Sequence, residues 1–177
     1  ITPFITARCY EQIKVDVAFH CLPVIIVGVG SGLSYAELGV THHSCDDIAL
    51  IRNLPDMTIV CPGDSLEVRA ALRAAINHNR PVYLRLGKKG EPLVHKDTPY
   101  FEIGKGIVLM EGSDICILST GNMLSVATHV AKELETASFS VGAVSLHTVK
   151  PLDVGLLERI FKRYALVVTL EEHNISG

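Results

Sequence analysis

Two adjacent histidines, His42 and His43, are the residues of this chain best suited to chemistry. They end a loop of small residues, Gly39-Val40-Thr41, and a short helix with aspartates in its first turn follows them. The helix fixes the backbone of such a junction, so an imidazole there can face a ligand. Because imidazole changes charge near neutral pH, it can also transfer a proton. The pattern predicts a catalytic His42 with His43 supporting it; the alternative is a loop histidine that only satisfies backbone groups.

The cysteines and glycines point to no other familiar site. The five cysteines are odd in number, irregularly spaced and without a Cys-x-x-Cys pair. This excludes the spacing of zinc ribbons and redox motifs and predicts buried free thiols in a reducing, cytoplasmic compartment. Gly28, Gly30 and Gly32 read G-x-G-x-G and not G-x-G-x-x-G. They favour close approach of the backbone to a ligand or a neighbouring chain over nucleotide binding.

Composition narrows the class of protein further. The chain has 177 residues, enough for one or two small domains, and a formal charge of −3. That charge argues against a nucleic-acid partner, which usually requires a basic stripe. No apolar run reaches the roughly 18 residues that span a membrane, and the first residues lack the pattern of a signal peptide. We expect neither a nucleic-acid nor a membrane partner.

The elements that must position the histidines alternate between strands and helices. Apolar runs of strand length are predicted at 22–27, 57–61, 82–86, 106–110, 115–119, 141–146 and 165–170, with helices at 7–20, 64–78, 121–134 and 153–163. Ser44 is predicted to cap the helix after the histidines, and Asp64 with Glu67 forms a capping box. Alternating strands and helices predict parallel sheets with right-handed crossovers, hence an α/β fold.

A polar, proline-bearing segment divides the chain. It covers residues 89–103 and is predicted to be a linker between one module at 1–88 and a second at 104–177. We therefore expect two consecutive parallel-sheet α/β domains.

Both modules resemble the transketolase family of thiamine-diphosphate enzymes. The first resembles its pyrimidine-binding domain, through residues at the family's spacing: Gly39, Thr41, His42, Arg52, Pro55, Met57, Val60, Pro62 and Asp64. The second resembles the transketolase C-terminal domain, through "IGKG…EGSDICILSTGNM", "VKPLD" and "EEHNISG". The resemblance implies that the chain begins inside the first domain and stops before the end of the second, so we expect both to be incomplete.

The resemblance also implies a cofactor and site residues. Family members use thiamine diphosphate and Mg²⁺; the Gly-Asp-Gly…Asn motif that holds the diphosphate and metal is absent here and belongs to an N-terminal domain or subunit. His42 is implied near the donor's carbonyl, and His43 replaces a glutamine. Phe4, one position off the strict match at Ile5, is the candidate to stack on the pyrimidine. Arg85 and Lys88 are the candidates to bind substrate phosphate, and we predict no metal ligand.

Some features of the family are missing or changed. The catalytic glutamate lies upstream of the family region where this chain starts; Glu11 does not replace it. Leu38 stands at the position of an acidic residue that contacts a substrate hydroxyl, and Gly30 at that of a histidine. These changes put the standard sugar-phosphate specificity in question. His173, after two glutamates, resembles a family signature with a structural or subunit-contact role.

The expected function is that of the C-terminal subunit or half of a transketolase-like transferase of carbohydrate metabolism. It would transfer a two-carbon ketol unit between sugar phosphates, in a homodimer or heterotetramer with a diphosphate-binding N-terminal partner, and be inactive alone. Two alternatives stay open. One is a deoxyxylulose-phosphate-synthase-like or 2-oxoacid dehydrogenase β-type thiamine enzyme, and the other is a non-catalytic assembly subunit with the same fold.

Overall fold

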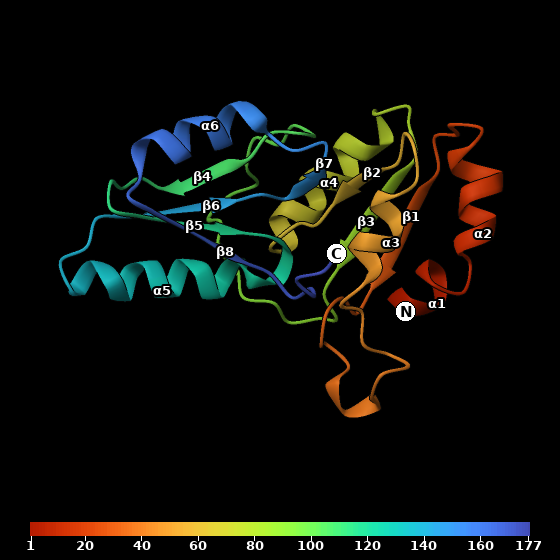
Figure 1. Ribbon diagram of the computed structural model, residues 1–177, viewed down its shortest axis with the longest axis horizontal. Helices are drawn as coiled ribbons and strands as arrows, with labels where there is room; N and C mark the ends of the chain where they lie inside the picture. The colour runs from red at the N-terminus through yellow and green to blue at the C-terminus, as the bar shows by residue number, and fades with distance from the viewer.

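Two four-stranded sheets organise the chain, and the computed structural model describes all residues from 1 to 177 (Figure 1). The first sheet has the order β1-β3-β2-β7 and the second the order β4-β6-β5-β8. The strands are β1 Ile25–Val29, β2 Thr58–Val60, β3 Val82–Leu86, β4 Ile107–Met110, β5 Ile115–Ser119, β6 Val141–Ser145, β7 Thr148–Lys150 and β8 Leu166–Leu170. The helices are α1 Thr2–Thr6, α2 Tyr10–Gln12, α3 Asp47–Arg52, α4 Ser65–Ile76, α5 Leu124–Thr136 and α6 Val154–Arg163.

The predicted α/β class is confirmed, although each sheet carries one antiparallel strand. In the first sheet β1, β3 and β2 are parallel and β7 runs antiparallel to β2. In the second, β6, β5 and β8 are parallel and β4 is antiparallel to β6. The reversal of β4 follows from its connection, because residues 111–114 between β4 and β5 are too few for a parallel crossover. Each sheet is therefore parallel, as predicted, except for one antiparallel edge strand.

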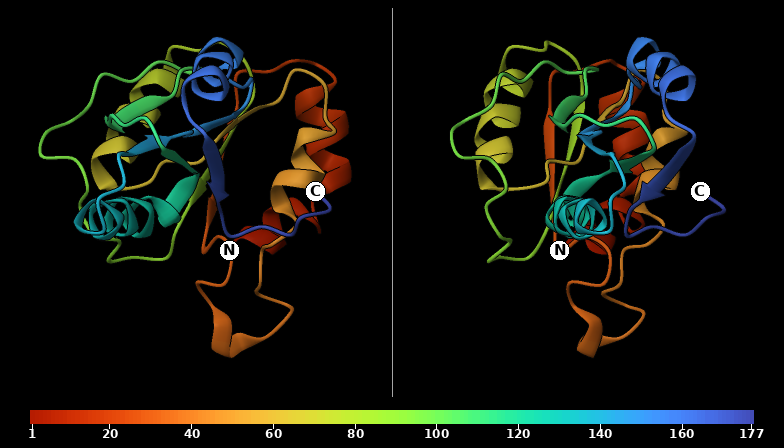
Figure 2. Two further views of the ribbon diagram at one scale, coloured as in Figure 1. Left: turned by 60° about the vertical axis from the view of Figure 1, so that its left-hand side comes forward. Right: turned by 90° about the vertical axis from the view of Figure 1, so that its left-hand side faces the viewer.

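Helices cover both faces of each sheet (Figure 2). On the first sheet, α4 packs small residues such as Ala71 on one face, and α3 packs Ile48 and Ile51 on the other. On the second, α5 contributes Ala127 to one face, and α6 covers the other with two apolar residues one turn apart, Leu156 and Ile160. Strands buried on both faces read as continuous apolar runs, which is why the sequence predicted them well. None of the helices is long and apolar enough to cross a membrane.

The first helical region departs from the prediction of one regular helix at 7–20. Short helix α1 precedes it, and α2 continues into a π-helical segment, Ile13–Ala18, in which Ile13 and Ala18 are buried. Tyr10, Ile13 and Ala18 can face the core in an α-helix and in a π-helix. Their periodicity alone could therefore not distinguish the two helix types.

The capping box predicted at α4 is present in a modified form. Asp64 Oδ1 accepts the N–H groups of Leu66 and Glu67, at 3.0 and 2.9 Å. Glu67 reaches one residue further back than usual, to the N–H of Gly63 at 2.7 Å. Both carboxylates therefore satisfy free donors at the helix start.

The same carboxylates fasten the segment 89–103 to the first module. Asp64 Oδ2 accepts the N–H groups of Val94 and His95, both at 2.9 Å, and Glu67 Oε1 lies 2.8 Å from His95 Nε2. Further along, Phe101 stacks on the buried His147 of the second module, with ring centroids 3.8 Å apart. The division at 1–88, 89–103 and 104–177 stays a prediction, but its middle segment contacts both modules.

We expect docking of this segment to depend on pH. The hydrogen bond that the His95 ring donates to Glu67 raises the pKa of His95 above its ordinary 6.5, against the effect of burial. For Asp64, burial raises the pKa, but backbone donors outweigh it and leave the value below 3.8. The His95 contribution is complete below pH 6.5 and is lost as the pH rises through the raised pKa, while the Asp64 contribution is lost as the pH falls through the lowered one. Docking should be firmest between these limits.

Hydrogen exchange of the Val94 and His95 amides, corrected for intrinsic rates, measures this. Protection should fall above the raised pKa in the wild type, and the His95→Phe variant should lack that fall. The exposed His20, which packs only on Phe19 among aromatic side chains, provides the control, because His20→Phe should leave the profile unchanged. An identical profile in His95→Phe would contradict the assignment.

Candidate functional site

The loop between β1 and α3 projects from the first sheet and carries the paired histidines (Figures 1 and 2). Its base is closed by two backbone hydrogen bonds between Gly32 and Ser44, at 3.1 and 2.9 Å. The N–H of Gly30 donates to Leu86 O at 3.0 Å, which ties the loop to the end of β3. Gly30 and Gly32 have φ values of +83° and +58°, a region that favours glycine. The predicted glycine loop thus fixes the base of the histidine loop.

His42 lies in an aromatic cluster that the sequence predicted in part. Its ring centroid is 5.2 Å from that of Phe4 on α1 and 6.2 Å from that of Tyr35, both edge-on. His42 Nδ1 lies 3.0 Å from Thr41 Oγ1, which leaves Nε2 available to a ligand. The buried Thr2 anchors α1 by donating to Val29 O at 3.1 Å, and thereby holds Phe4 at this place. Two residues predicted for one site, distant in the sequence, are in contact.

Lys88 joins the same cluster from the end of β3. Its Nζ lies 4.5 Å from the centroid of the Tyr35 ring and 3.5 Å from Glu37 Oε1. The pKa of Glu37 is lowered, first by a backbone hydrogen bond and then by Lys88. Lys88 is exposed and its ammonium group can exchange these weak partners for an anion. Tyr35 bridges His42 and Lys88 and was missed, because an aromatic loop residue carries no distinctive spacing.

His43 points elsewhere. Its Nε2 lies 3.0 Å from the carbonyl oxygen of Ala36, a contact within the loop. This contact braces the loop that carries His42. The proposed role in substrate binding stays a prediction.

Arg85 lies beneath this site and is 2% exposed. Its Nε donates to Asp47 Oδ2 at 2.8 Å, and its Nη2 donates to Ser44 O at 3.0 Å and Glu172 O at 2.9 Å. Tyr83 also donates to Asp47 Oδ2, at 2.6 Å. These three hydrogen bonds of Arg85 are with groups of its own chain, and its role in binding substrate phosphate stays a prediction.

The C-terminal segment packs against the start of α3. Asn174 donates twice to Cys45 O, from its backbone at 2.9 Å and its side chain at 2.6 Å. The N–H of Ala49 donates to His173 Nε2 at 3.4 Å, so His173 contacts the first module of its own chain. The helix α3 starts after Asp46 without a side-chain cap, and Ser44 Oγ is buried without a partner, so the predicted Ser44 cap was wrong. The backbone of Ser44 is held instead by Gly32 and Arg85.

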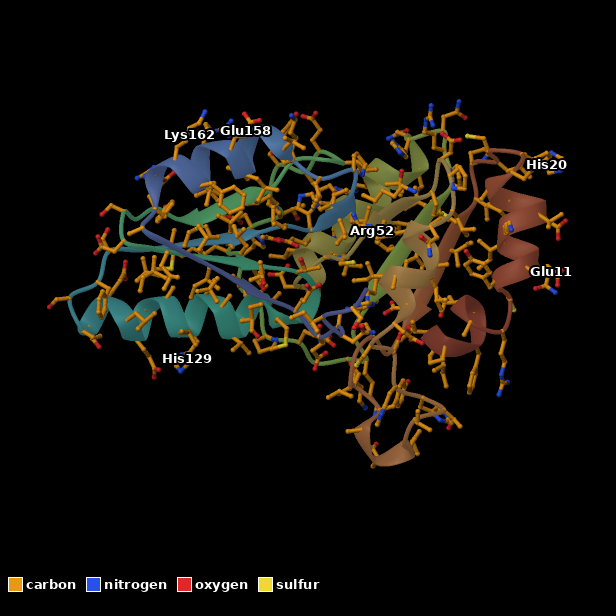
Figure 3. The ribbon with its side chains drawn as sticks, in the orientation of Figure 1. Glu11, His20, Arg52, His129, Glu158 and Lys162 are labelled. Carbon is orange, nitrogen blue, oxygen red and sulfur yellow. The ribbon has the colours of Figure 1, made fainter.

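Asp47 and Glu172 were not predicted as site residues. An aspartate in the first turn of a helix has a sufficient explanation in the helix dipole, and nothing in the sequence pairs it with the distant Arg85. Glu172 O reaches the site only because the second module folds back on the first. Glu11, in contrast, lies on the outer side of α2, away from this cluster (Figure 3).

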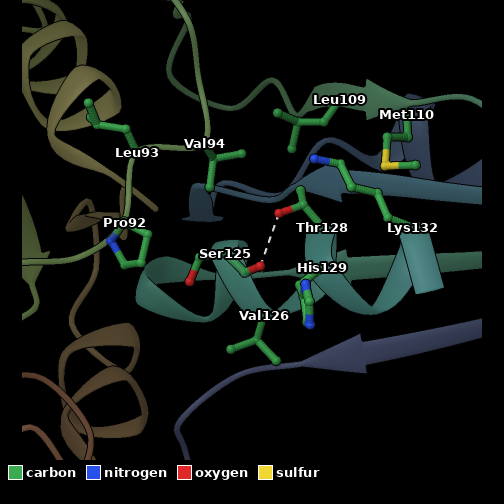
Figure 4. A pocket seen from close by; sticks show the side chains of 10 residues that line it. All are labelled: Pro92, Leu93, Val94, Leu109, Met110, Ser125, Val126, Thr128, His129 and Lys132. Atoms are coloured by element: carbon green, nitrogen blue, oxygen red, sulfur yellow. Dashed lines mark hydrogen bonds between the residues drawn. The ribbon is translucent and has the colours of Figure 1, made fainter.

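The two largest cavities lie in separate places. A cavity of about 460 Å³ lies beside Lys88, between the ends of β1 and β3 and the start of α4, with Asn122 from the second module. A larger one, about 560 Å³, lies between the segment 92–94 and α5, and is lined by Val126, His129 and Lys132 among others (Figure 4). Only the first adjoins a predicted site residue. The carboxyl ends of parallel strands, where it lies, are the usual ligand site of such sheets.

The residues at this site fit the pyrimidine end of a thiamine cofactor and do not fit its diphosphate end. No three histidine, cysteine, aspartate or glutamate side chains come together in a way that could hold a metal ion. The half-buried Phe4 beside His42 offers an aromatic face and an imidazole, which suit a flat heterocycle and not a diphosphate.

The fold and the site are those of a two-module α/β protein. The histidine loop lies at the strand ends of the first module, and the C-terminal segment of the second module supports it. Residues 2–91 match the model of the transketolase pyrimidine-binding domain, and residues 104–177 match that of the transketolase C-terminal domain. The chain therefore belongs to the transketolase family, as the resemblance predicted.

Named relatives agree with this. The chain is 33% identical over 175 residues, 98% of its length and 56% of the relative's, to an apulose-4-phosphate transketolase subunit of Phocaeicola vulgatus. It is 34% identical over 173 residues, 96% of its length and 27% of the relative's, to the 1-deoxy-D-xylulose-5-phosphate synthase of Parasynechococcus marenigrum. A solved structure described as a split gene transketolase, inactive beta4 tetramer, has a TM-score of 0.91 at 34% identity, over 100% of this chain and 57% of that one. The chain spans about half the length of the subunits it matches.

Proposed function

We propose that the chain is the C-terminal part of a transketolase that moves a two-carbon ketol unit between sugar phosphates. Thiamine diphosphate and Mg²⁺ would be held mainly by an N-terminal diphosphate-binding partner. The observation that carries the proposal is the contact between Phe4 and His42, with Lys88 joined to them through Tyr35. These groups suit, in turn, a pyrimidine ring, a reacting carbonyl and a phosphate.

The chain's own residues would bind, orient and transfer protons. Phe4 would pack on the aminopyrimidine ring of the cofactor. His42, through Nε2, would hold and move a proton at the donor's carbonyl and first hydroxyl oxygens. Lys88 would bind the substrate phosphate as a point charge. When bound, the cofactor supplies the nucleophilic carbon and accepts the electron pair of the broken bond.

A partner is supported by the surface of the histidine loop. Val40 and Leu38 at its tip are 85% and 48% exposed. Large apolar side chains at the tip of a projecting loop favour burial against a second polypeptide. The relative described as an inactive β4 tetramer is consistent with a C-terminal subunit that lacks activity without its partner.

A deoxyxylulose-phosphate-synthase-like reaction is the second candidate. Its support is the 34% identity to a synthase over nearly the whole chain. Both reactions use the same cofactor carbon, and assays with a ketose phosphate or a 2-oxoacid as donor separate them.

The His42→Ala variant tests the proposal directly. The chain is co-purified with its N-terminal partner, and ketol transfer is assayed with thiamine diphosphate and Mg²⁺. We expect kcat to fall about tenfold or more, since a positioned proton donor contributes at least that much. The exposed His129 serves as control, because His129→Ala should retain the wild-type rate. An unchanged kcat removes His42 from the mechanism, and a complete complex without transfer to any acceptor favours an assembly subunit.

Lys88 is tested by the form of its kinetic defect. Lys88→Ala should raise KM for a phosphorylated donor about tenfold to a hundredfold and leave kcat unchanged, because a hydrogen bond to a charged group contributes about 1.5–3 kcal/mol. With the dephosphorylated donor the two enzymes should be equal. The neighbouring Lys89 is also exposed, and Lys89→Ala should behave as wild type. Equal KM values for the phosphorylated donor would exclude the contact.

A further inference from the structure

We propose that Arg85 is a positioning residue, which sets the place of His42 by clamping the base of the histidine loop to the C-terminal segment. This inference rests on the proposed function, in which His42 transfers a proton. It assigns Arg85 an indirect role in place of the substrate contact that the sequence predicted.

The guanidinium joins three separate parts of the chain. Asp47 belongs to the first turn of α3, Ser44 to the end of the histidine loop, and Glu172 to the segment after β8. One Nη2 atom serves both carbonyl oxygens, so its two hydrogens are used, and Nε serves the carboxylate. An arginine fork holds such a set in fixed geometry.

Ser44 transmits this restraint to the histidines. Its carbonyl oxygen accepts from both Arg85 Nη2 and the N–H of Gly32, and its own N–H donates to Gly32 O. Ser44 is therefore held on two sides, two residues after His42. Because Thr41 Oγ1 and Ala36 O contact the imidazoles within the loop, a shift of the loop base moves both rings.

The C-terminal segment, residues 171–177, is itself fixed, so it can hold Arg85 in place through Glu172 O. The Asn122 side chain donates to Glu172 Oε2 at 2.8 Å, and Asn174 donates twice to Cys45 O. The second module thus supports the loop of the first through Arg85. A buried charge used in this contact is unavailable to the solvent-facing cavity beside Lys88.

Arg85→Lys separates positioning from folding. A lysine can keep the charge pair with Asp47, but its single ammonium group cannot reproduce the planar fork to both carbonyls. In the complex with the N-terminal partner we expect kcat to fall about tenfold to a hundredfold, with KM for the donor unchanged, because small misplacements of a reacting group have effects of this size. Arg80→Lys, at an exposed arginine paired with Asp56, should match wild type. A raised KM with normal kcat would return Arg85 to substrate binding and overturn the proposal.

A double-mutant cycle with His42→Ala gives the second test. If Arg85 acts through His42, Arg85→Lys should change kcat by no more than about twofold once His42 is absent, since coupled residues are not additive. The full loss in that background would overturn the proposal.

Thiol labelling gives a readout that needs no activity. Cys45 follows Ser44 and is partly buried, whereas Cys61 and Cys116 are fully buried. With Cys9 and Cys21 changed to serine, Arg85→Lys should speed labelling of Cys45 about tenfold or more, as for the loss of a charged hydrogen bond. Unchanged labelling of Cys45, or equal acceleration at Cys61 and Cys116, would overturn the proposal. If the wild-type complex lacks ketol transfer, the proposed function fails, while the labelling still decides whether Arg85 positions the loop.

Discussion

Replacing Asp47 by alanine should lower the free energy of unfolding by about 3–5 kcal/mol, because it leaves the Arg85 charge buried without its partner. Both side chains are almost completely excluded from solvent, at 0% and 1% exposure. Asp47 also accepts the Tyr83 hydroxyl, and burial followed by the Asp47 charge raises the pKa of that phenol well above its usual range. The substitution therefore leaves two buried donors unsatisfied, not one.

Urea unfolding measures the effect, and the chain provides a matched control. Glu111 pairs with Arg163 on the surface, where both are more than half exposed. Glu111→Ala should change the free energy of unfolding by no more than about 1 kcal/mol. Each variant removes the carboxylate that pairs with an arginine. The Asp47–Arg85 pair is buried, whereas the Glu111–Arg163 pair is exposed. Similar shifts of the midpoint at equal m-values would show that burial of the Asp47–Arg85 pair does not matter.

Replacing Gly32 by alanine should be nearly as severe. At φ +58° an L-residue costs about 1–2 kcal/mol relative to glycine. A Cβ there would lie 2.6 Å from Glu172 Cβ, and relieving such overpacking costs a further 1–3 kcal/mol or so. We expect a combined loss of about 2–5 kcal/mol, with the C-terminal segment displaced.

Limited proteolysis of residues 171–177, together with urea unfolding, checks this. Gly90 has φ +77°, and a Cβ added there would meet no atom within 4 Å, so Gly90→Ala should show only the backbone cost. Adding Glu172→Gly to Gly32→Ala removes the clash but also the hydrogen bond that Asn122 donates to Glu172 Oε2, so we expect a net recovery of at most about 2 kcal/mol. Protection of the segment equal to wild type in Gly32→Ala would contradict the predicted contact.

The elements that bury continuous apolar runs were the most predictable from sequence. β3 was predicted at its observed bounds, Val82–Leu86, and Asp64 caps α4 as its spacing indicated. The edge strands of the sheets were less predictable. Strand β7 has only three residues, and its partner β2 lies far earlier in the chain. Pairing at that distance depends on how the second module folds back, which no local pattern encodes.

In the candidate site, too, residues identified by type and spacing were predictable, whereas contacts with distant parts of the chain were not. His42 and Phe4 followed from types and spacing matched to a family, and the structure places them in contact. Arg85 was predicted from its nearness to Lys88, but alternate residues of a strand point to opposite faces, and its side chain enters the interior. Burial of a cation requires partners from elsewhere in the chain, here Asp47 and Glu172, and sequence alone did not supply them.

Strand β7 has a consequence for recombination between relatives. It follows β6 of the second sheet after two residues, yet its hydrogen bonds are to β2 of the first. Lys150 adds to this by donating to the carbonyl oxygens of Arg52 and Leu54, at 3.0 and 2.6 Å. A chimera joined at residues 89–103 would therefore insert a foreign edge strand into the first sheet. The β2–β7 pair therefore constrains the exchange of first and second modules among these subunits. For the hybrid to fold, β7 and β2 should come from the same parent.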